Sequence, residues 1–136
     1  MTANKIYKVV DKQMSAKMAK AVGAKKRECY RNSFLTMTTL SAQKLTDVIY
    51  VEGYAATEEL RFPIEHAWVI YNGKVIDPTW DNNKKAIYYS IVEYDYDSGI
   101  KALSANKNIL PVNKTRITMQ KYQEIMALFQ DDNSFK

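Results

Sequence analysis

The sequence predicts an α+β fold in which helices pack on an antiparallel sheet. Apolar residues recur at spacings of three and four in three segments, as is typical of amphipathic helices. Alternating segments rich in Val, Ile and Tyr separate the second helical segment from the third, and an Asn-Gly pair joins two of them. At 136 residues and 46% apolar, the chain has room for one buried core, so we expect residues 1–136 to form a single domain.

Each expected helix has its own boundary signals. The first follows a short strand at residues 6–10, with Asp11 placed to cap it and Gly23 to end it. The second has Cys29 in its first turn, and Thr118 is placed to cap the last. The apolar stripes are Met14, Met18 and Val22 in the first helix, Tyr30, Phe34, Met37 and Leu40 in the second, and Met119, Tyr122, Ile125, Met126 and Phe129 in the third.

The remaining strands are expected at residues 47–55, 66–71, 74–79 and 86–94. Asn72-Gly73 predicts a tight hairpin, because a type I′ turn needs a positive φ at both central residues. Gly53 predicts a close approach to the backbone within its strand. Residues 57–64 are interpreted as a loop, and the acidic stretch 93–97 after the last strand is assigned to no element.

The positive charge is concentrated near the N-terminus. Residues 1–27 hold eight Lys or Arg against one Asp, a net +7, which leaves −2 for the remainder and +5 for the chain. These cations alternate with apolar residues, as on the solvated face of a helix, and no nucleic-acid-binding motif accompanies them. We therefore favour a solvated face over a nucleic-acid site. A segment of this charge also suits an acidic partner.

The sequence favours a cytoplasmic protein that does not enter a membrane. The longest apolar stretches are short, such as Ala67–Tyr71, and the first ten residues lack the apolar core of a secretory signal. The single cysteine cannot form an intramolecular disulfide, which suits a reducing compartment. No cofactor or metal is expected, although a zinc site built from one Cys, one His and one Asp is a minor alternative.

The predicted hairpin brings His66 and Asp77 to one side of the sheet. A two-residue turn pairs Trp68 with Asp77 and His66 with Thr79, so His66 and Asp77 are diagonal neighbours about 7–8 Å apart at the backbone. An imidazole and a carboxylate can close that gap. In nucleophilic catalysis such a carboxylate holds the imidazole in the tautomer whose other nitrogen faces the nucleophile.

Cys29 is the only thiol available as that nucleophile. At a helix N-terminus, the exposed N–H groups and the helix dipole favour a thiolate, and the same N–H groups can stabilise an oxyanion. Taken singly, a lone Cys is usually a small buried apolar residue and a lone His a satisfied polar one. The combination of the only Cys, the only His and an Asp in hairpin register favours catalysis.

Three further residues are candidates for supporting roles. Asn32 lies one turn after Cys29 and can contact a substrate or link helix to sheet, and we favour the link. If its strand is central, the carboxylate of Glu52 is expected to be half-exposed or paired with Arg31 or His66, and a role in substrate binding stays open. Trp68 shares the face of His66 and can wall the site, whereas Trp80 is expected only to pack.

Four motifs between residues 28 and 80 resemble the transglutaminase-like (papain-like cysteine) superfamily, and within it a group of small uncharacterised bacterial and phage proteins. They are Cys29-Tyr-Arg-Asn-Ser33, Tyr50-Val-Glu-Gly-Tyr54, His66-Ala-Trp-Val69 and Asp77-Pro-Thr-Trp80. The resemblance implies a Cys at the N-terminus of a helix packed on an antiparallel sheet. It also implies that Cys29 is the nucleophile, His66 the general base and acid, and Asp77 the orienting carboxylate.

Two departures from the superfamily pattern stand out. The turn between His66 and Asp77 is shorter than in the large enzymes, and no upstream Gln or Trp can be assigned as the second oxyanion donor. The expected function is hydrolysis of an amide or ester bond in a protein, peptide or small molecule through a thioester on Cys29. Transfer to an amine is the less favoured outcome. The alternative is a catalytically silent binding or accessory protein that acts on a macromolecular partner.

Overall fold

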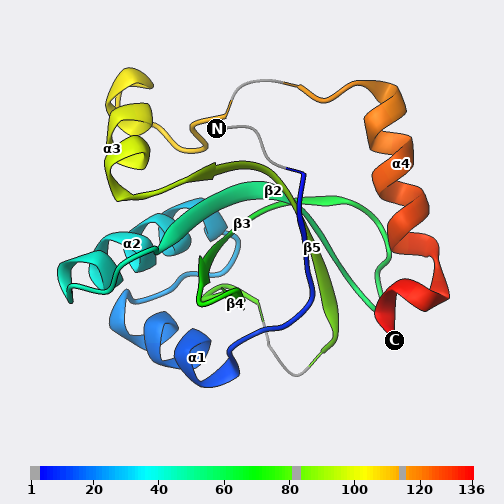
Figure 1. Ribbon diagram of the computed structural model, residues 1–136, viewed down its shortest axis with the longest axis horizontal. Coiled ribbons are helices and arrows are strands. Elements are labelled where there is room, and N and C mark those ends of the chain that lie inside the picture. The colour runs from blue at the N-terminus through cyan, green and yellow to red at the C-terminus, as the bar shows by residue number, and fades with distance from the viewer. Residues whose placement is uncertain (1–3, 81–83, 114–115) are drawn as a thin grey trace.

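The computed structural model describes residues 4–80, 84–113 and 116–136, which form a curled five-stranded sheet with helices around it (Figure 1). The strand order is β1-β5-β2-β3-β4, and neighbouring strands pair antiparallel. The strands are β1 (Ile6–Tyr7), β2 (Ile49–Thr57), β3 (Ile64–Tyr71), β4 (Lys74–Ile76) and β5 (Ala86–Tyr94). The helices are α1 (Lys12–Ala21), α2 (Cys29–Ala42), α3 (Tyr96–Ala105) and α4 (Met119–Gln130), followed by a 3₁₀ turn, η1 (Asp132–Phe135).

The sheet curls until its two edges meet. The chain after β1 crosses to β4. There the Asp11 N–H donates to the Val75 carbonyl, and the Val75 N–H donates to the Val9 carbonyl, both at a distance of 2.8 Å. The inner face of this curl is filled with large apolar side chains. They include Val51, Ala55, Trp68, Val75 and Tyr88.

Helices α2 and α4 cover opposite ends of the outer face of the sheet. At one end α2 packs on Tyr50, Ala67 and Val69. At the other end α4 and η1 pack on Ala56 and Ile87. The stretch of β2 between these two packing sites therefore lies in the gap between α2 and α4. Because successive residues of a strand point to opposite faces, Glu52 and Tyr54 share this outer face with Tyr50.

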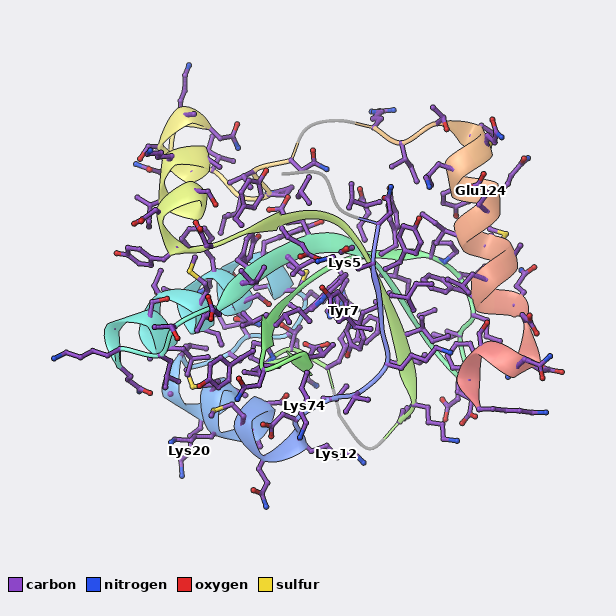
Figure 2. The ribbon with its side chains drawn as sticks, viewed as in Figure 1. Lys5, Tyr7, Lys12, Lys20, Lys74 and Glu124 are labelled. Carbon is purple, nitrogen blue, oxygen red and sulfur yellow. The ribbon has the colours of Figure 1, made fainter. Side chains whose placement is uncertain are left out.

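The eight basic side chains of residues 1–27 are all exposed, as on a solvated face. Figure 2 shows Lys12 and Lys20 of α1 pointing away from the sheet. Among the described residues, no helix is both long and apolar enough to cross a membrane.

Several local predictions are confirmed. Asn72 and Gly73 have φ values of 53° and 73° in the hairpin between β3 and β4. The carboxylate of Asp11 accepts from the N–H of Met14, and the hydroxyl of Thr118 accepts from that of Lys121, as N-caps do. Strand β5 occupies 86–94, the range expected for it.

Several boundaries were predicted wrongly, and one helix was missed. Strand β2 is Ile49–Thr57 rather than 47–55, and β3 begins at Ile64 rather than residue 66, so both ends of the predicted loop 57–64 belong to strands. Strand β4 ends at Ile76 rather than residue 79, because the carboxylate of Asp77 turns back to accept backbone N–H groups and breaks the extended conformation. The predicted strand at 6–10 is regular only over Ile6–Tyr7. Helix α3 was missed: Asp95, inside the acidic stretch, caps it by accepting from the N–H of Ser98.

We expect Gly53→Ala to destabilise the protein by about 2–4 kcal/mol, since overpacking against backbone is not relieved by rotamer changes. A Cβ at Gly53 would lie 2.2 Å from the Tyr89 carbonyl oxygen. Gly99→Ala is the matched control, because the nearest atom to its Cβ would be the flexible end of Met37 at 3.3 Å, with Tyr94 and Phe34 at ordinary contact distances of 3.5 and 3.7 Å. Urea unfolding measures both free energies. Equal stability of the two variants would contradict the close packing of β2 on β5.

Candidate active site

The core of the candidate site is a hydrogen bond between two buried side chains. His66 Nε2 lies 2.8 Å from Asp77 Oδ2. His66 is 2% exposed and Asp77 is fully buried. His66 comes from β3, and Asp77 follows β4 directly, so the tight hairpin between these strands sets their separation. With Nε2 bonded to the carboxylate, Nδ1 is the ring nitrogen left for another partner.

The Asp77 carboxylate is held from several sides. Its Oδ2 also accepts from the Tyr88 hydroxyl at 2.8 Å. Its Oδ1 accepts from the backbone N–H groups of Thr79 and Trp80 at 2.9 and 3.1 Å. The backbone N–H of Asp77 donates to the Ser15 hydroxyl of α1 at 3.0 Å. Since both oxygens are bonded, the carboxylate has little freedom to turn away from the imidazole.

Aromatic rings enclose the imidazole. Trp80 stacks on His66 with ring centroids 4.0 Å apart and planes at 24°. Trp68 and Tyr88 lie farther away, each with its ring centroid 6.2 Å from that of His66. The stacked indole faces favour a positively charged ring, because the face of an aromatic ring carries negative potential.

These surroundings favour the charged form of both partners. Burial lowers the pKa of His66, but the Asp77 carboxylate, followed by the hydrogen bond and charge of Cys29, outweighs burial and raises the pKa from 6.5 to about 9. Burial acts to raise the pKa of Asp77, yet His66 and the hydrogen bonds from Thr79 and Tyr88 hold it below its usual value. At neutral pH the pair is therefore an imidazolium and a carboxylate.

Cys29, the first residue of α2, lies close enough to the imidazole to contribute to the raised pKa of His66. Its side chain is buried, with 9% exposed. No side chain caps the N-terminus of α2, and the first intrahelical N–H bond there runs from Asn32 to the Glu28 carbonyl. The N–H groups of Cys29, Tyr30 and Arg31 thus have no intrahelical acceptor and can bind an oxyanion.

Asn32 ties the start of α2 to its surroundings. It is fully buried. Its amide exchanges two hydrogen bonds with the backbone of Lys25 and donates to the Thr79 hydroxyl at 3.0 Å. These contacts join the loop before α2 to the turn after Asp77, so Asn32 fixes the Cys29 helix relative to the carboxylate.

Glu52 does not have the partners expected for it. Instead of Arg31 or His66, its buried carboxylate accepts from the Tyr50 hydroxyl and from the backbone N–H groups of Val112 and Asn113, at 2.7–2.8 Å. His66 lies on the opposite face of the sheet, since it pairs with Gly53 rather than with Glu52. Glu52 therefore anchors the segment that leads to α4.

Sequence reasoning missed the residues that hold Asp77 and His66. Tyr88 and Ser15 come from β5 and α1, and no local pattern indicates that their hydroxyls meet Asp77. Trp80 was expected only to pack, whereas it is the ring nearest the imidazole. The motif Asp77-Pro-Thr-Trp80 was the available signal for this role of Trp80. The turn whose backbone N–H groups bond the Asp77 carboxylate also sets the position of Trp80.

The arrangement of a thiol, an imidazolium and a fixed carboxylate suits nucleophilic chemistry. Among the described residues, no group of three or more His, Cys, Asp or Glu side chains is placed to hold a metal ion. No protein-family model, curated protein or solved structure matches the chain. The chemistry of the site therefore rests on its geometry alone.

We expect the imidazole of His66, the only histidine, to titrate near pH 9 in an NMR experiment. In Asp77→Asn the largest influence that raises the pKa of His66 is gone while burial remains, so this pKa should fall well below its wild-type value. Preserved dispersion of the amide signals would show that the variant is folded. A wild-type midpoint near 6.5 would contradict the buried ion pair.

Tyr88→Phe removes a buried hydrogen bond to a charged carboxylate and is expected to cost about 1.5–3 kcal/mol of stability. Tyr89→Phe is the matched control on the same strand, because the Tyr89 hydroxyl accepts only from the half-exposed Lys121. Denaturant unfolding compares the two. A cost for Tyr88→Phe no larger than the control's would exclude a structural role for that hydroxyl at Asp77.

Proposed function

We propose that the protein is a transglutaminase-like cysteine hydrolase or acyltransferase that uses Cys29, His66 and Asp77 as a triad. The observation that carries the proposal is that one buried imidazole is hydrogen-bonded to a carboxylate through Nε2 and has its pKa raised in part by the nearby Cys29, the only thiol of the chain. That is the connectivity in which an imidazole activates a nucleophile and later supplies a proton to the leaving group.

The reaction proceeds in two steps. The Cys29 thiolate attacks an amide or ester carbonyl, and the helix N–H groups stabilise the oxygen that becomes negative. His66 gives its proton to the leaving amine or alcohol, and a thioester on Cys29 remains. Water then attacks the thioester, His66 takes one proton from this water, and the carboxylic acid leaves as the Cys29 thiolate and the His66 imidazolium are restored. Asp77 keeps the ring aligned throughout.

Hydrolysis is favoured over transfer to an amine. Water reaches the thioester by diffusion and needs no dedicated binding site, whereas an amine acceptor has to be bound and oriented beside the thioester.

One observation favours a catalytically silent binding protein as the second candidate. Cys29 is 9% exposed and His66 only 2%, so a substrate carbonyl has limited access to the sulfur. A protein that uses the fold only for binding a macromolecular partner would need no better access. The two candidates differ in the reactivity of the thiol.

We expect iodoacetamide to alkylate Cys29 at pH 6 at least about tenfold faster than it alkylates the same thiol in the denatured chain, because an ordinary thiol is almost fully protonated there. His66→Ala should slow the reaction by about tenfold or more, since the imidazolium partner of the thiolate is lost. Tyr89→Phe serves as a control that should not change the rate.

As the pH drops from 8 to 6, the alkylation rate of Cys29 should also fall by a smaller factor than the alkylation rate of an ordinary thiol. A thiol that resists alkylation in the folded protein at every pH would exclude the enzyme and favour the silent candidate. A thiol that reacts equally fast in His66→Ala would exclude the triad.

A further inference from the structure

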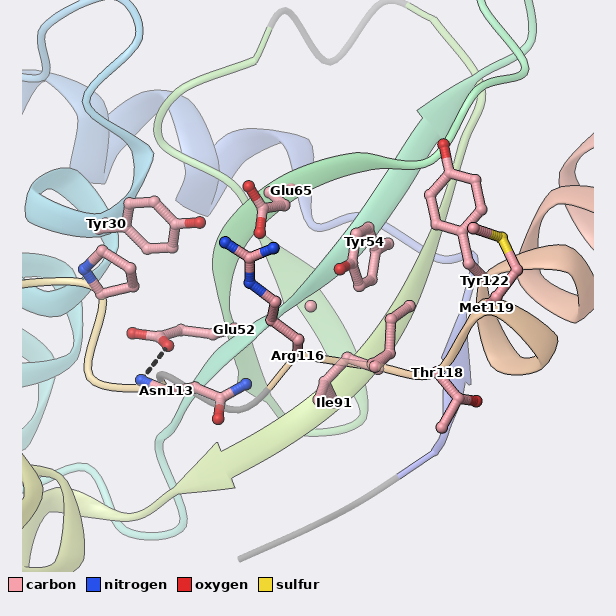
Figure 3. Close-up of a pocket in the computed structure, with 13 residues that line it drawn as sticks. Tyr30, Glu52, Tyr54, Glu65, Ile91, Asn113, Arg116, Thr118, Met119 and Tyr122 are labelled. Carbon is pink, nitrogen blue, oxygen red and sulfur yellow. Dashed lines mark hydrogen bonds between the residues drawn. The ribbon is translucent and has the colours of Figure 1, made fainter.

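A groove of about 540 Å³ opens on the outer face of the sheet, in the gap between α2 and α4 (Figure 3). Strand β2 lines it with Glu52, Gly53 and Tyr54. Tyr30 of α2 closes one end, and Tyr122 of α4 closes the other. The groove is therefore bounded by β2, α2 and α4, and residues of the segment that leads to α4 complete its lining.

The groove lies next to the N-terminus of α2. Tyr30, the residue that follows Cys29 at the start of this helix, lines it. Burial, followed by the charges of Cys29 and Glu65, raises the pKa of the Tyr30 hydroxyl, so both charges act on this hydroxyl. A group bound in the groove would thus sit next to an acyl carbon held at the sulfur.

Two carboxylates and one guanidinium line this groove, those of Glu52, Glu65 and Arg116. Glu65 lies beside Tyr54, its partner across β2 and β3. The Glu65 carboxylate is exposed and, over the described ranges of the chain, forms no hydrogen bond or ion pair. Glu52 adds a second carboxylate. Arg31, the cation next to Tyr30, is turned away and bonded to the carbonyls of Val22 and Gly23.

A cation from the chain itself already points into the groove. Figure 3 shows the Arg116 guanidinium directed toward Glu65, with Tyr30 to one side and Tyr54 to the other. It is not close enough to Glu65 to form an ion pair: within the described residues, none involves Arg116. A free carboxylate and tyrosine rings around a guanidinium are the features of a site for a cationic side chain.

We propose that this groove binds a cationic side chain of the acyl donor, such as that of a lysine or arginine residue in a peptide, next to the bond that Cys29 attacks. Glu65 supplies the opposite charge, and Tyr30 and Tyr54 supply aromatic faces. Arg116 occupies the same position in the free protein and leaves it when substrate binds. This inference rests on the proposed function and specifies the substrate class of the same site.

Thiol reagents of different charge test the inference on Cys29 itself. We would measure the rates at which cationic, neutral and anionic methanethiosulfonates react with Cys29, each divided by its rate with free 2-mercaptoethanol. The cationic reagent should react about tenfold faster than the anionic one, because an exposed carboxylate and cation–π contacts each give a few-fold preference.

Two substitutions should shift this charge preference in opposite directions. Glu65→Gln should reduce it by about threefold, and Arg116→Gln should raise it by about threefold. Glu58→Gln is the matched control: it removes the same charge from the exposed loop that precedes β3, outside the groove. A change of equal size in Glu65→Gln and Glu58→Gln would overturn the inference.

The neutral reagent separates failure of the inference from failure of the proposed function. Rapid reaction with it that depends on His66, but no charge preference, would leave the function standing and remove the cationic site. No reaction with any reagent would overturn the function, and with it the assignment of the groove to an acyl donor.

A binding experiment tests the groove without the thiol. Cys29→Ser would be titrated with the methylamides of N-acetylarginine and of N-acetylcitrulline, which differ chiefly in charge. Saturable NMR shifts of Tyr30 and Tyr54 are expected with the arginine compound and should be lost in Glu65→Gln. Equal shifts with both compounds, or none with either, would overturn the cationic site.

Discussion

The hydrogen bond between His66 and Asp77 is the interaction on which the rest of the site depends. Burying an imidazolium and a carboxylate removes both from water, a cost that their mutual attraction offsets only when further hydrogen bonds satisfy them. Asp77 receives such bonds from Tyr88, Thr79 and Trp80. A charged pair buried at this cost is weak evidence that the pair stabilises the protein. An imidazole with a shifted pKa beside a thiol is instead typical of functional sites.

Much of the fold serves to hold this pair. The curl of the sheet brings the start of α1 to β4, and Ser15 then bonds the backbone of Asp77. Strand β5 contributes Tyr88, and Asn32 of α2 bonds Thr79 in the turn after Asp77. Elements far apart in sequence thus converge on one turn. The same contacts fix the N-terminus of α2, where Cys29 lies.

The sequence predicted those features that local chemistry decides. The Asn72-Gly73 turn, the capping residues Asp11 and Thr118, and the side of the sheet shared by His66 and Asp77 follow from backbone geometry alone. A hairpin count fixes register because the side-chain period of a strand is two.

The remaining features depend on contacts between distant segments, which no local pattern reveals. The carboxylate of Glu52 bonds residues 112 and 113, sixty positions along the chain, rather than the partners that its neighbours suggested. Strand β4 is short because the Asp77 carboxylate competes for backbone N–H groups. The groove beside Tyr30 exists only because α2 and α4 cover opposite ends of one sheet face.

The most direct test of the account is whether Cys29 becomes acylated and then loses the acyl group. Intact and peptide mass spectrometry would follow the protein after it is mixed with p-nitrophenyl acetate. We predict a burst of p-nitrophenolate, an acetyl group that appears on Cys29 and then disappears, and neither event in Cys29→Ser. Acetylation confined to lysines or to the N-terminus, with Cys29 unmodified, would contradict the account.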